Sequence, residues 1–147
     1  TIRATTGFRR SIFELDAMSR LYLSRLDWEE VSYRFFTGGF FTSGVDMRTL
    51  KPEEARELIE DAAKDHFQCD FDGNHVGVRR FATIIEDSEG KPLHLLSMAE
   101  AATPVRDRDA RISEARRILS NARVVLQQQI LKEADGKSGS IHPAATG

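Results

Sequence analysis

The chain has 147 residues, a formal net charge of −2 and a single cysteine. That length is typical of one domain, and a hydrophobic fraction of 40% is too high for a disordered chain. One cysteine excludes a disulfide framework within the chain and favours a reducing compartment such as the cytoplasm, and no apolar run approaches the ~20 residues that cross a bilayer.

The first third of the chain contains one helical pattern and one ambiguous segment. Apolar residues recur at steps of three and four along residues 8–25, which predicts a helix there. The next segment, 28–36, has a capping-box pattern that favours a helix. Its apolar residues also alternate with polar ones, which favours a strand. We weigh the helix slightly higher and expect a strand near 40–46.

The middle of the chain predicts a helix followed by a hairpin. Pro52 with two glutamates behind it is a strong helix start, and the apolar pattern extends that helix to about residue 67. A polar break follows at 70–74. Residues 76–86 and 92–101 are rich in Val, Ile and Leu and flank a polar loop that contains glycine, which predicts a β-hairpin.

The last long pattern is helical, over about residues 107–133. At 1.5 Å per residue this helix is about 39 Å long, more than a small domain needs. We therefore predict an α+β fold in which an N-terminal helix, a central helix and a long C-terminal helix pack on a small antiparallel sheet built around the hairpin. Residues 1–134 would form one domain, and the Gly-, Ser- and Ala-rich residues 135–147 a flexible C-terminal tail.

Residues 66–75 hold the densest set of reactive side chains. His66, Cys69 and His75 carry groups that bind transition metals, and Asp70 and Asp72 add carboxylates, so all five are candidate catalytic residues. Their spacing matches no common zinc site, and the later ligands of a calcium loop are missing. We favour a helix-to-strand connection whose polar residues bond the local backbone, with Cys69 a small buried hydrophobe and not a nucleophile.

Aromatic residues form a second pattern. Six of the twelve lie between residues 28 and 41. Adjacent pairs cannot both point inward, so we consider five of them as candidate binding residues: Trp28, Tyr33, Phe36, Phe40 and Phe41. The interpretation that we weigh higher is a core element covered on both sides.

Arginines along the C-terminal helix form a third pattern, with Arg116 and Arg117 as candidate contacts to a partner or to phosphates. Acidic residues interrupt the row, and the chain is net acidic. A solvated helix face is therefore the favoured interpretation, and we do not expect nucleic-acid binding.

These patterns lead to one main hypothesis and two alternatives. The main hypothesis is a non-enzymatic interaction, assembly or regulatory module that binds a protein partner or a second copy through the C-terminal helix and the aromatic segment. The first alternative is a small enzyme or ligand-binding domain with a pocket near residues 66–75, with or without a metal. The second is nucleic-acid binding through the arginines of the last helix. The sequence indicates no particular cofactor and leaves open whether the chain is an enzyme.

Overall fold

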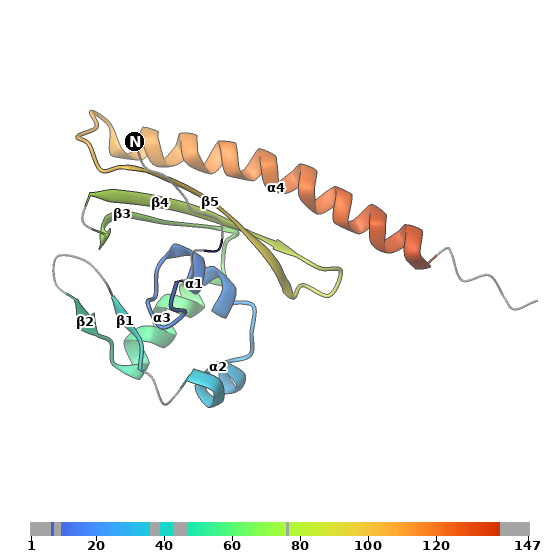
Figure 1. The fold of residues 1–147 in the computed structure, drawn as a ribbon, viewed down its shortest axis with the longest axis horizontal. Coiled ribbons are helices and arrows are strands. Elements are labelled where there is room, and N and C mark those ends of the chain that lie inside the picture. The colour runs from blue at the N-terminus through green and yellow to red at the C-terminus, as the bar shows by residue number, and fades with distance from the viewer. Residues whose placement is uncertain (1–6, 8–9, 36–38, 43–46, 76, 139–147) are drawn as a thin grey trace, which may run out of the picture.

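The computed structural model describes residues 7, 10–35, 39–42, 47–75 and 77–138. A three-stranded antiparallel sheet forms the middle layer, in the order β3 (Phe67–His75), β4 (Val78–Glu86) and β5 (Pro92–Ala101). The helix α4 (Arg108–Ser138) covers one face of this sheet, while α1 (Ala17–Leu23) and α3 (Pro52–Ala62) lie on the other side (Figure 1). Farther from the sheet lie α2 (Trp28–Phe35) and the short pair β1 (Phe41–Thr42) and β2 (Arg48–Thr49). This arrangement confirms the predicted α+β fold.

The two faces of the sheet bury different side chains because successive residues of a strand point in opposite directions. On the α4 face, Phe67, Phe71 and Phe81 pack with Ala115 and Leu119 of α4. On the α1 face, Ala82 and Ile84 of β4 pack with Ala17 and Leu21 of α1. A third cluster, centred on Leu15, Leu23, Val31, Phe40, Leu50, Ala55 and Ile59, joins the helices below the sheet to β1 and β2.

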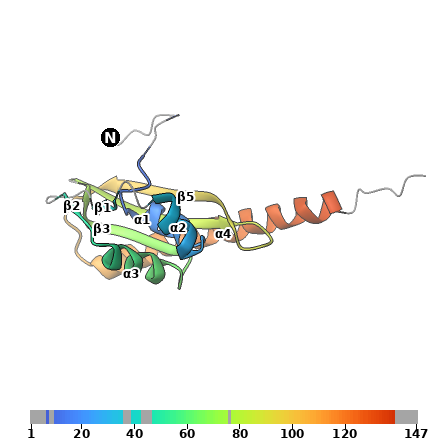
Figure 2. The same cartoon turned by 90° about the horizontal axis from the view of Figure 1, so that it is seen from below.

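The helix α4 extends well past the sheet, as Figures 1 and 2 both show. It runs to Ser138, so residues 135–138, predicted as tail, are helical. The rest of the predicted tail lies outside the described residues. None of the described helices is long and apolar enough to span a membrane.

The predicted N-terminal helix begins too early. Residues 10–16 are not helical, because their backbone pairs with β1: the N–H of Leu15 donates to the carbonyl of Phe41, and the N–H of Phe41 donates to the carbonyl of Phe13. The helical spacing of apolar residues there reflects packing into the third cluster and not a helix. Tertiary pairing has overridden the local pattern.

The predicted central helix ends too late, and the polar connection after it is a strand. The helix α3 ends at Ala62, and the side chain of Asp65 accepts a hydrogen bond from the backbone N–H of His66 at 2.7 Å as the chain turns into β3. Residues 70–74, predicted as a turn, continue β3 with a register irregularity between Asp70 and His75.

Other expectations hold. Residues 28–35 form a helix, the alternative that we favoured over a strand, and β4 and β5 form the predicted hairpin. Asp87 closes the hairpin loop, because its side chain accepts hydrogen bonds from the backbone N–H groups of Glu89 and Lys91. Of the strand predicted near 40–46, residues 41–42 are present as β1, and 43–46 lie outside the described residues.

Candidate functional site

Most of the deeply buried charges in the described part of the chain gather where the N-terminus of α1 meets the sheet. Glu14, Asp16, Arg20 and Asp70 are each less than a tenth exposed. Arg10 and Arg80, with 17% and 15% of their side chains exposed, contact the same group. We call these six residues the α1 ion cluster. Burying charge is costly unless it is paired, and such clusters often accompany functional sites.

Asp16 is the centre of the α1 ion cluster. Its Oδ1 accepts a hydrogen bond from the backbone N–H of Ser19 at 2.9 Å and so caps the N-terminus of α1. Its Oδ2 lies 3.0 Å from Nε of Arg10 and 3.4 Å from Nη1 of Arg80. One carboxylate therefore both fixes where the helix begins and draws two arginines toward that point.

Asp70 and Arg20 attach α1 to β3. The carboxylate of Asp70 accepts from the backbone N–H of Ala17 at 2.6 Å and from Nη1 of Arg20 at 3.0 Å. Arg20 also donates to the carbonyls of Leu15 and Cys69 and to the side chain of Gln68, at 2.7, 3.2 and 3.0 Å. All three of its nitrogens are thus engaged, so this pair serves as an anchor.

Arg80 differs from Arg20 in having donors to spare. It lies on β4 directly opposite Asp70 on β3 and Ala99 on β5. In the described part of the chain, its guanidinium makes one hydrogen bond, the 3.4 Å contact with Asp16. A guanidinium has five N–H donors. Arg80 is therefore the member of the cluster with the most capacity to bind a ligand.

The surface beside Arg80 is open, and exposed side chains of β5 line it. On β5, Leu95, Ser97 and Ala99 are exposed and pair with Ile84, Ala82 and Arg80 of β4. Next to them is a pocket of about 250 Å³, lined by Arg10, Ser11, Ile12, Asp16, Met18, Ser19, Tyr22 and Leu95. Apolar walls with a few polar groups are typical of small-molecule sites. Arg10 lines this pocket, and Arg80 contacts Asp16 in its lining. The arrangement suits a small molecule with an acidic group near these arginines and an apolar body against Met18 and Leu95.

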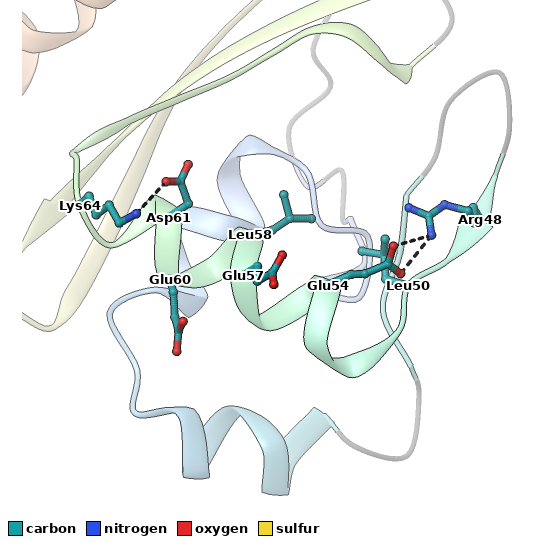
Figure 3. A pocket seen from close by; sticks show the side chains of 8 residues that line it. All are labelled: Arg48, Leu50, Glu54, Glu57, Leu58, Glu60, Asp61 and Lys64. Carbon is teal, nitrogen blue, oxygen red and sulfur yellow. Dashed lines mark hydrogen bonds and ion pairs between the residues drawn. The ribbon is translucent and has the colours of Figure 1, made fainter.

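A larger groove, of about 620 Å³, follows the solvent side of α3 (Figure 3). Its charged side chains largely pair with one another: Arg48 contacts Glu54 at 3.0 Å, and Lys64 contacts Asp61 at 3.2 Å. Glu57 and Glu60 add further negative charge. These exposed groups are those of a solvated helix face, so this groove is a weaker candidate despite its size.

A third groove, of about 410 Å³, lies along β3, close to the predicted segment 66–75, and is lined in part by Cys69 and Arg116. Arg116 is already engaged, because it lies 2.5 Å from Asp65 and 4.5 Å above the ring of Phe67. Partial burial alone would raise the pKa of Asp65, but the hydrogen bonds from Arg116 and from the backbone, together with the charge of Arg116, outweigh it and the pKa is lowered. Among the described residues, this groove therefore has fewer unpaired polar groups for a ligand than the α1 ion cluster has.

The structure does not bring the predicted residues of segment 66–75 to one place. His66 is half-exposed, with Nε2 3.4 Å from Glu86, and Asp72 is exposed and pairs with Arg108 at 3.2 Å. Cys69 packs with the core on the α4 face, and burial raises the pKa of its thiol, which opposes a role as nucleophile. The side chain of His75 lies outside the described residues.

Two further points bear on the predicted chemistry of this segment. The described residues contain no group of three or more His, Cys, Asp or Glu placed to hold a metal ion. Asp70 alone joins a cluster of buried charges, and it does so through α1 and not through its own neighbours in the sequence.

The aromatic segment contributes mainly to the core. Phe40 is buried in the third cluster, with Trp28 partly buried against it. Phe41 is half-buried, and Tyr33 is 89% exposed. Phe36 lies outside the described residues. Of the two candidate arginines, Arg116 is paired as described and Arg117 is exposed.

Sequence reasoning missed Asp16, Arg20 and Arg80 as site residues. Arg79 and Arg80 form a visible pair, and strand alternation alone places them on opposite faces of the sheet. Asp16, three residues before Ser19, is a recognisable N-cap position. What the sequence did not reveal is that this helix start meets Arg80, 64 residues later.

Comparisons with known proteins add a fold-level result. No protein-family model and no curated protein sequence matches the chain. Among solved structures, an IclR transcriptional regulator from Alicyclobacillus acidocaldarius aligns with a TM-score of 0.71 over 86% of this chain at 16% identity. The C-terminal domain of the E. coli transcriptional regulator KdgR aligns with a TM-score of 0.69 over 84% of it at 19% identity.

A third neighbour is the inducer-binding domain of a double mutant of the Acinetobacter transcription factor PobR, solved in complex with 3-hydroxybenzoic acid. It aligns with a TM-score of 0.68 over 82% of this chain at 16% identity. The chain spans 49% of the Alicyclobacillus regulator, 73% of the KdgR domain and 67% of the PobR domain. Similarity at these identities shows a shared fold.

These neighbours overturn the main functional hypothesis. They are regulators of transcription or domains of such regulators. The physical reason is visible in the packing: Phe40 belongs to the core, and Ala115 and Leu119 of the long helix are buried against the sheet. The alternative of a ligand-binding domain fits better. Binding of a protein partner or a second copy, and a reducing intracellular location, stay predictions.

Proposed function

We propose that this chain is a ligand-sensing domain of a transcriptional regulator, and that it binds a small organic anion at the α1 ion cluster. The observation that carries the proposal is the largely buried guanidinium of Arg80, which, among the described residues, keeps spare donors beside the exposed side chains of Ser97 and Ala99. The shared fold with regulator domains, one of them an inducer-binding domain, supports the regulatory role.

An anion is the expected ligand because the carboxylate of Asp70 in the cluster is already paired, while the guanidinium of Arg80 keeps donors for a ligand. Asp70 is held by Arg20 and by the backbone N–H of Ala17, so that carboxylate does not attract a cationic ligand. Within the described ranges, the guanidinium of Arg80 makes one hydrogen bond, the long contact with Asp16. A carboxylate matches the planar fork of arginine and can accept two parallel hydrogen bonds from it.

The size and polarity of the pocket indicate how large the ligand is and which groups it carries besides its acid. At about 250 Å³ the pocket is below the range usual for drug-sized ligands, so the ligand should be small. Met18, Tyr22 and Leu95 provide apolar wall, and the hydroxyl of Ser97 on the neighbouring part of β5 can donate to or accept from a polar substituent. A hydroxylated aromatic or short aliphatic acid has this combination of groups.

Thermal unfolding with a panel of small acids tests the proposal, with 3-hydroxybenzoate as the first probe and 3-hydroxybenzyl alcohol as its neutral counterpart. A ligand at a hundred times its Kd should stabilise the fold by roughly 2.7 kcal/mol. We expect acids, and not the alcohol, to raise the Tm, and Arg80→Gln to abolish the shift. The matched control is Arg116→Gln, which removes an arginine outside the site.

The proposal fails if no acid in the panel raises the Tm of the wild type. It also fails if Arg80→Gln and Arg116→Gln respond to an acid as the wild type does, because binding would then occur elsewhere. Isothermal titration of the same variants gives the stoichiometry and separates binding at one site from a general effect of anions.

A further inference from the structure

Helix α1 connects the α1 ion cluster to the opposite end of β4. Its N-cap, Asp16, contacts Arg80, and Arg25, the residue after its C-cap, contacts Glu86. Arg80 and Glu86 lie on the same strand, six residues and about 20 Å apart. Because α1 packs on the residues between them, Ala82 and Ile84, the helix lies along β4 with an ion pair at each end.

Glu86 contacts elements on both faces of the sheet. Its Oε1 lies 2.5 Å from Nε of Arg25, and its Oε2 lies 3.6 Å from Nη2 of Arg123 on α4 and 3.4 Å from Nε2 of His66. Gln127, one turn further along α4, accepts from the backbone N–H of Glu86 at 3.1 Å and donates to its carbonyl at 2.5 Å. A single residue at the end of β4 therefore joins the end of α1 to the middle of α4.

This connection is more sheltered from water than the other routes to α4 from the helices and strands beside it. The side chains of Arg25, Glu86 and Arg123 are 8%, 17% and 19% exposed. The Glu100–Arg111 pair, which joins β5 to α4, is 29% and 21% exposed, and the side chains of the pairs Asp65–Arg116 and Asp72–Arg108 are each at least 40% exposed. Water and salt screen sheltered charges less, so they hold their geometry more firmly.

Arg25 also restricts how the end of α1 can move. It donates to the carbonyl of Ala62 at 3.2 Å and to that of Asp65 at 2.9 Å, which ties it to the end of α3. On the other side, Arg123 donates to the carbonyl of Ile84 at 2.9 Å. A displacement of α1 along β4 must therefore alter the contact between Arg25 and Glu86, and Glu86 cannot respond without changing its contact with α4.

We propose that α1 transmits the state of the α1 ion cluster to α4 through the contacts of Arg25, Glu86 and Arg123. An anion that draws Arg80 away from Asp16 weakens the ion pair that holds the N-cap of α1. The helix α1 then shifts together with Asp16. Arg25 moves with the helix and passes the change to Glu86. The proposed function supplies the natural input, a ligand at Arg80, but the coupling itself is a property of the apo protein. Arg25 is a positioning residue in this proposal and does not touch the ligand.

Hydrogen exchange of the full chain, followed by mass spectrometry, tests the coupling without a ligand. Asp16→Asn perturbs α1 at its cluster end, and exchange is read in peptides covering residues 119–130 of α4. We expect Asp16→Asn to speed exchange there by roughly threefold or more, the size of a modest coupling energy. In an Arg25→Gln or Arg123→Gln background the same substitution should have no such effect. Arg80→Gln is the second perturbation and takes the place of Asp16→Asn if that variant does not fold.

The control is Arg116→Gln, which removes an arginine of α4 that pairs with Asp65 and not with Glu86. In that background Asp16→Asn should act on residues 119–130 as it does in the wild type. Equal responses in the wild type, Arg25→Gln and Arg123→Gln would overturn the proposal. So would the absence of any response in α4 when exchange in α1 itself has risen.

A second arm adds 3-hydroxybenzoate to the wild type and to Arg25→Gln. The coupling predicts slower exchange in both α1 and residues 119–130 of the wild type, but in α1 alone of Arg25→Gln. If the acid protects both segments equally in the two proteins, the coupling is wrong although the ligand site is right. If the acid does not bind, the proposed function fails for this acid, and the ligand-free arm still decides the coupling.

Discussion

Asp70 helps to fix the position of α1, and removing its carboxylate should lower the stability of the fold. It is 8% exposed, and its carboxylate faces the guanidinium of Arg20 and the first N–H of α1. Removing one partner of a buried pair leaves an uncompensated charge, which typically costs about 3–5 kcal/mol. Most of the free energy lost on removing Asp70 therefore comes from leaving the charge of Arg20 buried without its carboxylate partner.

We predict that Asp70→Ala lowers the free energy of unfolding by about 3 kcal/mol or more. Asp70→Asn should cost less, because an amide oxygen still accepts a hydrogen bond from Ala17 or Arg20. Urea titration followed by circular dichroism measures both. The control is Asp72→Ala, two residues along the same strand and 71% exposed, which should change stability by no more than about 0.5 kcal/mol. Similar losses at the two positions would show that Asp70 is not an anchor.

The same residue shows how far the candidate site could be predicted. The sequence draws attention to Asp70 because it stands among His66, Cys69 and Asp72, and the expected pocket is near it. Its actual partner, Arg20, is 50 residues earlier. No local spacing reports such a contact, so the carboxylate was assigned to turn chemistry. Arg80, which the proposed function depends on, was visible only as one of a basic pair.

At the scale of secondary-structure elements, the attachment of α4 to β5 depends on Glu100 and Arg111. Nε of Arg111 lies 3.1 Å from both oxygens of Glu100, and Nη2 lies 2.7 Å from one of them. Hydrogen bonds from Arg111 lower the pKa of Glu100 below its ordinary value of 4.5, and Glu100 in turn raises the pKa of Arg111. A depressed carboxyl pKa contributes stability above the ordinary pKa and loses it as the pH falls through the folded-state value.

We predict that Glu100→Gln is less stable than the wild type at neutral pH and equally stable in acid well below pH 4.5. The difference at neutral pH should be at most about 1 kcal/mol, because Glu100 is 29% exposed and water screens the pair. Urea titrations across the pH range measure it. Glu114→Gln, which leaves the Arg111–Glu100 pair intact, is the control. A stability difference that persists unchanged into acid would contradict the role of the carboxylate charge.

Elements whose partners are close in sequence were predicted well. The hairpin of β4 and β5 was identified because both strands and their loop lie within a short stretch. The long helix was identified from its own periodicity. The start of α1 was misplaced because residues before Ala17 pair with Phe41 of β1. Residues 70–74 of β3 were taken for a turn because pairing of the strand with β4 provides the stabilisation that their polar composition lacks.

At the scale of the whole molecule, the sheet separates the side that carries the α1 ion cluster from a side that is covered by one helix. The α1 ion cluster and its pocket lie on the side of α1, while α4 lies on the other and continues past the sheet (Figure 1). Residues 131–137 of α4 are all exposed. Helical residues without tertiary packing add little stability of their own. The folding unit should therefore end before the helix does.

We predict that a chain ending at Lys132 folds with nearly the stability of the full chain. The deleted part contributes no buried side chain among the residues that the structure describes, so the free energy of unfolding should change by less than about 1 kcal/mol. Thermal unfolding by circular dichroism measures this. A chain ending at Ala115 is the contrasting variant: it lacks Leu119, which is 2% exposed in the α4-face core, together with Arg123 and Gln127, which hold the end of β4. That shorter chain should lose cooperative unfolding. Equal behaviour of the two truncations would mean that the packing of α4 on the sheet is not what stabilises the domain.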